Sequence, residues 1–454
     1  MNLYKRSKRR VVVTGIGMMT PLGVNVNNSW QEILQYKSGI SKIQSFDTSN
    51  LPVKIAGEIP AFEAKDYISP KSLKSMSKFI QYGMIAAGEA IEDSGIRNMS
   101  NQMRNNIGVI VGSGLGGIEM IEQNCDFKHT QLLHNQYKVQ KINTTNASHV
   151  DATKSSKINS VSPFFIPSFL NNMLSSHISI KYGFYGVNYS PSASCVTGSN
   201  AVGQAYQLIS DGHSKCIICG SSEAPITPLI ISGFASAKAL STKFNDTPQT
   251  ASRPWDRDRS GFVLSEGAGI LVLEEYEQAE KRNAKIYGEV RGYSSSSDGY
   301  HITSPNPDCK IAVRTILKAL SLAQINPGEI DYINAHATST IVGDLIEYNL
   351  ISHLLEKTNS FNQSKRILVS STKSSIGHTL GASGAIEAIF TVLSLYYNII
   401  PPTLNLDNID PQITNQKIHI ASDKIAVEDK KFKYALSTSF GFGGLNSALV
   451  FGKL

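Results

Sequence analysis

The sequence lacks an apolar stretch long enough to cross a bilayer. A membrane-spanning helix needs about 20 predominantly apolar residues. The longest candidate, residues 388–400, is interrupted by Thr391, Ser394 and Asn398. We therefore expect no membrane span, and we interpret this stretch as a buried core helix.

Cysteine is scarce, with five residues in a chain of 454. Disulfide-stabilised domains are usually short and dense in cysteine, so a disulfide framework is not expected. Cys216 and Cys219 form one C-x-x-C pair, but no second pair completes a four-ligand zinc site. The apolar run around them favours a buried strand, and we expect no metal site.

Acidic residues are missing before Glu32, and basic residues cluster at the start of the chain. The net charge of the chain is +7, and without the five basic residues among the first ten it would be +2. These residues are Lys5, Arg6, Lys8, Arg9 and Arg10. No stripe of alternating basic and aromatic residues follows, which disfavours nucleic-acid binding. The basic tip has the chemistry of a very short mitochondrial transit segment. We favour the mitochondrial matrix, with a bacterial-type cytoplasmic location as the alternative.

Strand-like runs alternate with helical stretches along the chain, which is typical of layered α/β proteins. Helices are expected at 74–94 and 312–323. The expected strands are short and rich in branched apolar residues: 11–14, 107–111, 216–220, 270–274, 330–334, 367–371 and 434–437. The first of them is expected to end in a glycine turn at Gly15.

Cys195 follows a run of small residues and precedes a helical stretch. A thiol at a helix N-terminus meets unpaired N–H groups and the positive end of the helix dipole, and both favour the thiolate. Ala193, Ser194 and Gly198 leave room for a substrate carbonyl beside the sulfur. A lone cysteine is more often a small buried residue, so this nucleophile needs histidine partners.

Two later segments provide those partners. His336 lies in the run from Asn334 to Thr340, and His378 ends the run that begins at Ser371. A catalytic cysteine commonly acts with histidines that are distant in sequence. The three residues together indicate thioester chemistry.

Cys195, His336 and His378 resemble, in that order, the Cys-His-His set of the β-ketoacyl-acyl-carrier-protein synthases, including their mitochondrial branch. The resemblance extends nearly from end to end, through four further segments in family order: Gly112–Gly117, Arg253–Gly261, Gly381–Glu387 and Ser439–Gly444. It implies an α/β thiolase-like fold, in which duplicated halves form a five-layered αβαβα core. The N-terminal half, 1–285, would carry the nucleophile and a polar insertion at about 122–160, and the C-terminal half, 286–454, the histidine pair.

The resemblance also implies a reaction, the decarboxylative Claisen condensation of fatty acid elongation. Cys195 would carry the acyl chain, while His336 and His378 would stabilise the enolate formed from malonyl-carrier protein. The backbone N–H groups of Cys195 and Phe440 would form the oxyanion hole, and the Phe440 ring would gate the acyl pocket. No general base is needed, because loss of carbon dioxide creates the carbanion.

Supporting residues follow from the same resemblance. Lys373 would hold the histidine geometry and pair with Glu387, and Thr338 and Thr340 would bind the phosphopantetheine arm. The enzyme itself would bind no cofactor, because acyl-carrier protein brings both substrates on its phosphopantetheine. The implied assembly is a homodimer.

Four residues differ from the usual family pattern: Ser194, Ala337, Thr438 and Leu445. None of them supplies a catalytic atom. They leave the preferred acyl-chain length and the size of the pocket open.

The sequence fits other functions of related proteins less well. Thiolases use a second catalytic cysteine, but Cys309 lacks a matching glycine-rich context. The initiating synthases use a Cys-His-Asn set, which the second histidine, His378, does not match. A noncatalytic chain-length partner would lack the nucleophile. The glycine loop Gly112–Gly117 resembles a dinucleotide cradle, but no strand with an acidic ribose ligand follows it.

Overall fold

The computed structural model describes residues 8–124, 162–356, 366–428 and 432–454 of the chain. The polar insertion expected at about 122–160 starts inside helix α5 (Ile118–Asn124), and the rest of it lies outside the described residues.

One mixed sheet of eleven strands organises the described part of the chain, in the order β12-β10-β9-β14-β15-β8-β1-β7-β6-β4-β5. Its strands are β1 (Val11–Met19), β4 (Gly108–Gly112), β5 (Asn188–Tyr189), β6 (Cys216–Glu223), β7 (Gly267–Glu275), β8 (Gly288–Ser297), β9 (Tyr332–Asn334), β10 (Ile367–Ser370), β12 (Ile418–Ile420), β14 (Tyr434–Gly441) and β15 (Leu445–Gly452). Two small sheets pair β2 (Ser41–Lys42) with β3 (Ile55–Ala56), and β11 (Ile399–Ile400) with β13 (Ile425–Ala426).

Helices cover both faces of this sheet. Their bounds are α1 (Val26–Leu34), α2 (Pro70–Leu73), α3 (Lys78–Ser94), α4 (Asn101–Arg104), α5 as above, α7 (Phe165–Phe169), α8 (Met173–Tyr182), α9 (Thr197–Ser210), α10 (Pro228–Ser236), α11 (Tyr276–Lys281), α12 (Lys310–Ala323), α13 (Ile341–Glu356), α14 (Lys373–Ile376) and α15 (Ser383–Tyr397). Local sequence sets several ends. The Asn25 side chain caps α1, and Gly95 ends α3 in the left-handed conformation, with a φ of 68°.

The sheet contains the same five-strand pattern twice. The order β1-β7-β6-β4-β5 in one half matches β8-β15-β14-β9-β10 in the other. In both halves the first two pairings are antiparallel and the next two are parallel. The halves join where β1 pairs with β8, and the division expected at 285/286 falls between α11 and β8. The prediction of duplicated halves is confirmed.

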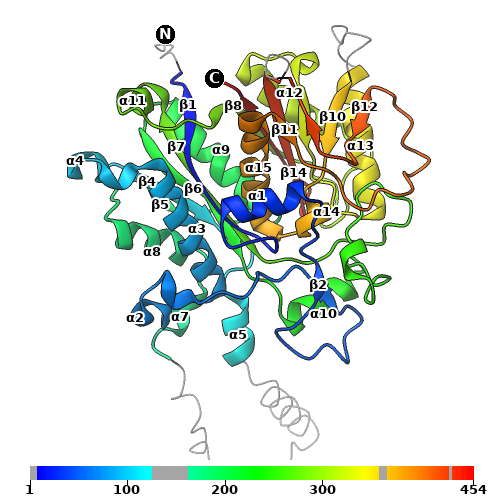
Figure 1. The fold of residues 1–454 in the computed structure, drawn as a ribbon, viewed down its shortest axis with the longest axis horizontal. Coiled ribbons are helices and arrows are strands. Elements are labelled where there is room, and N and C mark those ends of the chain that lie inside the picture. The colour runs from blue at the N-terminus through cyan, green and yellow to red at the C-terminus, as the bar shows by residue number, and fades with distance from the viewer. Residues whose placement is uncertain (1–7, 125–161, 357–365, 429–431) are drawn as a thin grey trace, which may run out of the picture.

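The two halves of the sheet form two layers of strands, with helices outside each half and between the halves, which makes five layers. Helices α3 and α8 cover the outer face of the N-terminal strands, and α12 and α13 lie outside the C-terminal strands (Figure 1). Helices α9 and α15 pack against each other and against strands of both halves. They form the middle layer of the predicted αβαβα arrangement.

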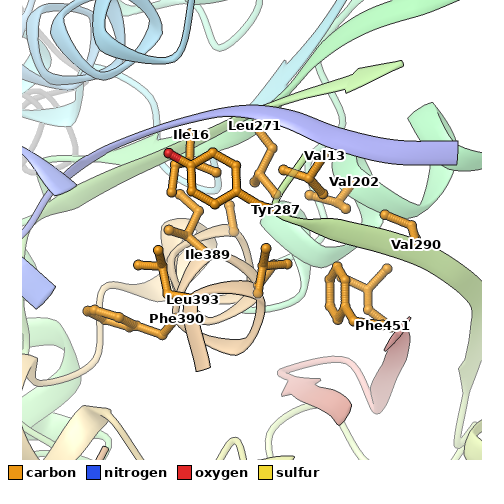
Figure 2. Packing of buried hydrophobic residues seen from close by; sticks show 14 of the residues in the cluster. Val13, Ile16, Val202, Leu271, Tyr287, Val290, Ile389, Phe390, Leu393 and Phe451 are labelled. Atoms are coloured by element: carbon orange, nitrogen blue, oxygen red, sulfur yellow. The ribbon is translucent and has the colours of Figure 1, made fainter. Parts of the chain in front are cut away.

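The central hydrophobic core surrounds α15. Its side chains come from both halves, as Figure 2 shows for Val13, Ile16, Val202, Leu271, Val290, Ile389, Leu393 and Phe451. In the described part of the chain, the segment Leu380–Tyr397 has the length and composition to cross a membrane, but 89% of it is buried inside the protein. A helix that is apolar on all sides and buried in this way is a core helix, as expected.

The prediction of a turn at Gly15 was wrong, because β1 continues to Met19 with a register shift between Val13 and Gly15. Helix α3 crosses this strand so closely that a Cβ atom at Gly17 would lie 1.9 Å from the Ala86 carbonyl oxygen. The glycine at this position therefore allows close packing between helix and strand rather than a turn.

Candidate active site

Cys195 lies in a tight turn two residues before α9. The turn is held by Thr197, whose hydroxyl accepts from the Ala193 N–H and donates to the Ser194 carbonyl, each at 2.8 Å. Ser194 adopts a φ of 47°, a strained value for a residue other than glycine. This backbone holds the half-buried sulfur at the wall of a cavity of about 790 Å³.

A close crossing of α9 and α15 brings the first histidine to this sulfur. A Cβ atom at Gly198 would lie 2.6 Å from the Ala385 nitrogen, and one at Gly384 would lie 2.1 Å from the Ser199 hydroxyl. Because the helices touch near their N-terminal ends, the residues before them also meet. His378 Nε2 lies 3.2 Å from Cys195 Sγ.

His336 completes the predicted group of three. Its ring is edge-on to that of His378, with the centroids 5.3 Å apart, and its Nδ1 lies 3.3 Å from Lys373 Nζ. An ammonium group can only donate, so Nδ1 of His336 accepts and its proton sits on Nε2. Lys373 is buried and also contacts the Glu387 carboxylate.

Glu347 is a site residue that the sequence reasoning missed. Its buried carboxylate accepts from the backbone N–H groups of His336 at 2.9 Å and Ala337 at 2.6 Å, and from the Thr438 hydroxyl at 2.7 Å. It therefore fixes the backbone that carries His336. The sequence feature that could have indicated Glu347 is its place in the helix after the histidine segment, on the side of α13 that is buried.

Both imidazoles are neutral at pH 7. Burial lowers the pKa of His336 and of His378 well below the usual range, and the nearby Lys373 ammonium acts in the same direction on each. Burial raises the pKa of Glu387 to about 7, although Lys373 opposes that shift. Neutral rings offer N–H donors without adding charge to the site.

The expectation of a lowered cysteine pKa was wrong. Burial raises the pKa of the Cys195 thiol to about 12, and the Lys373 charge and a hydrogen bond from the Phe442 backbone N–H only partly offset this effect. Loss of hydration disfavours the charged thiolate. The resting nucleophile is a thiol.

The structure brings the backbone N–H of Phe442, and not that of the predicted Phe440, toward Cys195. Phe440 lies within β14, opposite Asn446 of β15, and its ring packs edge-on against His336 at 5.9 Å. Phe442 lies in the following turn, directs its N–H toward Cys195 Sγ and exposes 37% of its surface beside Phe234. Because β14 extends through Gly441, Phe440 is a strand residue and Phe442 is a turn residue.

Thr338 and Thr340 line the cavity, and their hydroxyl oxygens lie 3.1 Å apart. Buried Arg259 holds the backbone after Thr338 in place, because its guanidinium donates to the carbonyls of Thr340 at 3.0 Å and Ile341 at 2.7 Å. Three of the four departures from the family pattern also line the cavity: Ser194, Ala337 and Leu445.

The glycine loop after β4 has no free phosphate cradle. The N–H groups of Gly114 and Leu115 and the Ser113 hydroxyl all donate to the buried carboxylate of Glu223. The Glu223 side chain already occupies these donors, which removes the main support for dinucleotide binding. Cys216 and Cys219 lie on β6 in hydrophobic clusters on opposite faces of the sheet.

Comparison with known proteins places the chain in a family. The model of the β-ketoacyl synthase N-terminal domain matches residues 8–279, and that of the C-terminal domain matches residues 287–407. The chain belongs to the β-ketoacyl synthase family.

Curated relatives and solved structures agree with this assignment. The chain is 43% identical to 3-oxoacyl-[acyl-carrier-protein] synthase 2 of Vibrio cholerae, over 99% of this chain and 100% of the relative. It is 38% identical to a mitochondrial 3-oxoacyl-[acyl-carrier-protein] synthase of Arabidopsis thaliana, over 99% and 94%. A β-ketoacyl synthase from Burkholderia phymatum superimposes with a TM-score of 0.83 at 29% identity, over 98% and 100%. A type II polyketide ketosynthase, solved with its acyl-carrier protein and bound to the hexaketide, gives 0.79 at 31% identity, over 98% and 100%.

Proposed function

We propose that the protein is a 3-oxoacyl-[acyl-carrier-protein] synthase of fatty acid elongation. It condenses malonyl-carrier protein with an acyl chain bound to Cys195. The observation that carries the proposal is the position of two neutral imidazoles beside one thiol: His378 lies 3.2 Å from the sulfur, and the His336 ring is edge-on to His378.

In the first half-reaction, Cys195 Sγ attacks the thioester carbonyl of an acyl-carrier protein. A sulfur–carbon bond forms at Cys195, the bond to the carrier sulfur breaks, and the thiol proton passes to that sulfur. The N–H groups of Cys195 and Phe442 are the donors for the oxyanion, and losing one such donor typically costs a hundredfold or more in rate. The covalent intermediate divides one difficult step into two.

In the second half-reaction, malonyl-carrier protein loses carbon dioxide and becomes an enolate. The Nε2–H groups of His336 and His378 stabilise its oxygen, and the carbanion attacks the acyl group on Cys195. The products are a 3-oxoacyl-carrier protein, carbon dioxide and the Cys195 thiolate, which takes one proton from solvent. Lys373, paired with Glu387, holds His336 in the donor tautomer.

The carrier protein is the proposed partner and brings both substrates. Thr338 and Thr340 offer hydroxyl groups to the amides of its phosphopantetheine arm from the cavity wall. The solved polyketide ketosynthase with its acyl-carrier protein supports this partner.

The proposed assembly is a homodimer through the edge of the sheet. Strand β5 ends the eleven-strand order, and an unpaired edge strand is a template for another chain. Apolar side chains are exposed around it, with Ile180 at 78%, Tyr185 at 76% and Val187 at 40%. A second copy of this chain would cover them.

Two compartments fit the relatives, which include mitochondrial and bacterial proteins. The proposal favours the mitochondrial matrix because of the basic first residues, with bacterial-type cytoplasm as the alternative. In the folded protein, Arg9 and Arg10 form ion pairs with Glu275 and Glu289, and residues 1–7 lie outside the described residues. Fluorescence imaging of the chain with and without residues 2–8 tests this.

Mass spectrometry of the intact protein tests the central proposal. We expect an acyl adduct on Cys195 after mixing with acyl-carrier protein that carries C8 or C16 chains, and release of carbon dioxide when malonyl-carrier protein follows. The relative yields of the two adducts report the chain-length preference. A protein that acquires no adduct from either donor is not a synthase.

A further inference from the structure

The two imidazoles have different partners on their Nδ1 atoms. His336 Nδ1 lies beside the Lys373 ammonium, whereas His378 Nδ1 lies 2.9 Å from the hydroxyl of Ser383. Ser383 is 1% exposed and is the first residue of α15. A lysine can only donate, but a serine hydroxyl can donate or accept, so the tautomer of His378 depends on the rest of the hydrogen-bond chain.

We propose that Ser383 is a positioning residue that keeps the His378 proton on Nε2, facing Cys195 and the substrate. The proposal rests on the function proposed above and assigns to Ser383 the task that Lys373 performs for His336. Ser383 touches neither the nucleophile nor the substrate and acts through the ring.

Thr379 determines which way the hydrogen bonds between Thr379, Ser383 and His378 are donated. Its hydroxyl oxygen lies 3.0 Å from that of Ser383, and both side chains are buried. If Thr379 donates to Ser383 and Ser383 donates to His378, every hydroxyl hydrogen has an acceptor. In the reverse direction the Thr379 hydrogen has no acceptor among the described residues, which leaves a buried donor unpaired. The favoured order is Thr379 to Ser383 to His378 Nδ1, which leaves the ring proton on Nε2.

The backbone of His378 is already fixed by other contacts. Its N–H donates to the Val263 carbonyl at 2.8 Å, and its carbonyl accepts from the Ser265 N–H at 3.0 Å. Phe262 lies edge-on to the ring, with the centroids 5.2 Å apart. These contacts place the ring but do not choose between its two nitrogen atoms, so the hydroxyl of Ser383 makes that choice.

Only the second half-reaction needs the N–H donor of His378 on the enolate. The test therefore measures the two half-reactions separately in Ser383→Ala, with malonyl-carrier protein for decarboxylation and octanoyl-carrier protein for acylation of Cys195. We expect decarboxylation to fall roughly tenfold, the rate equivalent of one ordinary hydrogen bond, with KM unchanged. Acylation should stay within about twofold of the wild-type rate, and Ser383→Thr, which keeps a hydroxyl, should restore decarboxylation.

Ser394→Ala is the matched control. Ser394 is a fully buried serine on the same helix, and its hydroxyl donates to the Phe390 carbonyl, away from the site. We expect both of its rates to equal those of the wild type.

Wild-type decarboxylation in Ser383→Ala would overturn the inference, as would equal loss of both half-reactions. Failure of Ser383→Thr to restore the rate at an unchanged melting temperature would also overturn it. A wild-type protein inactive in both half-reactions would overturn the proposed function and this inference with it.

Discussion

His378 Nε2 and Cys195 Sγ are 3.2 Å apart, although 183 positions separate the two residues in the chain. The contact joins a thiol whose pKa burial raises to about 12 to an imidazole whose pKa burial lowers well below its usual range. Both shifts favour a neutral thiol beside a neutral imidazole, and with the ring proton on Nε2, as proposed above, His378 donates to the sulfur and does not accept its proton. A neutral thiol is a weaker nucleophile than a thiolate, so we expect the free enzyme to react slowly with added electrophiles.

Replacing the nucleophile should separate the two half-reactions. We expect Cys195→Ser to lose acyl transfer, because a hydroxyl is far less acidic than a thiol. Cys195→Gln should still decarboxylate malonyl-carrier protein, because His336 and His378 remain. Intact-protein mass spectrometry and release of carbon dioxide measure the two steps. An acyl adduct that persists in the serine variant, or maps to Cys309, would contradict the assignment.

The raised pKa of Cys195 predicts an unusual pH profile for its alkylation. An ordinary thiol has a pKa near 8.5, so its reaction rate levels off above about pH 9. For a thiol with a pKa of about 12, the thiolate fraction still rises about tenfold per pH unit between pH 7 and 10. The rate of inactivation by iodoacetamide should follow that slope without a plateau. A plateau below pH 9 would show that the thiol is activated in the free enzyme.

Removing either histidine should block decarboxylation and spare part of the acylation. The reason is that enolate stabilisation by N–H donors belongs to the second half-reaction alone. Release of carbon dioxide by His336→Ala and His378→Ala, compared with their acyl adducts, tests this. A variant that condenses at the wild-type rate would reduce its histidine to a structural residue.

Lys373 and Glu387 can be separated from folding by a paired substitution. Lys373→Met leaves the Glu387 carboxylate buried without its cation, and breaking a buried ion pair in this way costs about 3–5 kcal/mol. The double variant Lys373→Met with Glu387→Gln should regain most of the melting temperature. It should not regain decarboxylation, because His336 Nδ1 still lacks its donor. Recovery of both would make the pair purely structural.

Most of the fold could be predicted from the sequence, because buried strands and amphipathic helices carry strong local patterns. Strand β6 at Cys216 and helix α12 up to Ala323 appear where they were expected. The role of each glycine was harder to predict from the sequence, because a glycine can serve either close packing of the backbone or a turn. Gly17 serves the packing of α3, and Gly441 still belongs to a strand.

The central residues of the candidate site could be predicted from the sequence, but its supporting contacts and its electrostatics could not. Cys195, His336, His378 and Lys373 meet as expected, because each lies in a distinctive segment. The direction of the Cys195 pKa shift depends on how deeply the thiol is buried, and no local pattern reports this. Glu347 and Ser383 act through contacts between elements that only the folded chain brings together.

The edge of the sheet predicts the state of assembly. Ile180→Glu places a charge on the exposed apolar face beside β5, and a buried unpaired charge strongly disfavours association. We expect the wild-type protein to be a dimer by light scattering and this variant to be a monomer. Leu322→Glu, on the outer helix α12 and 39% exposed, is the control and should stay dimeric. Equal masses for both variants would place the dimer interface elsewhere.

Phe440 in β14 and Phe442 in the following turn should respond differently to substitution. Phe440 is half-buried against His336, so Phe440→Ala should lower the free energy of unfolding by about 1–3 kcal/mol and disturb decarboxylation. Phe442 is a turn residue with an exposed ring, so Phe442→Ala should fold normally and keep its backbone N–H. It should alter the selection between short and long acyl donors.

Phe442→Pro removes the phenyl ring, as Phe442→Ala does, and in addition removes the N–H that points to Cys195, so comparing the two variants separates the oxyanion role from the gate. We expect acyl transfer to fall about a hundredfold or more, at a melting temperature near that of Phe442→Ala. Stopped-flow acylation with C8 and C16 donors measures both effects. Acyl transfer at the Phe442→Ala rate in the proline variant would remove this N–H from the oxyanion hole, and unchanged chain-length selection in Phe442→Ala would remove the ring from the gate.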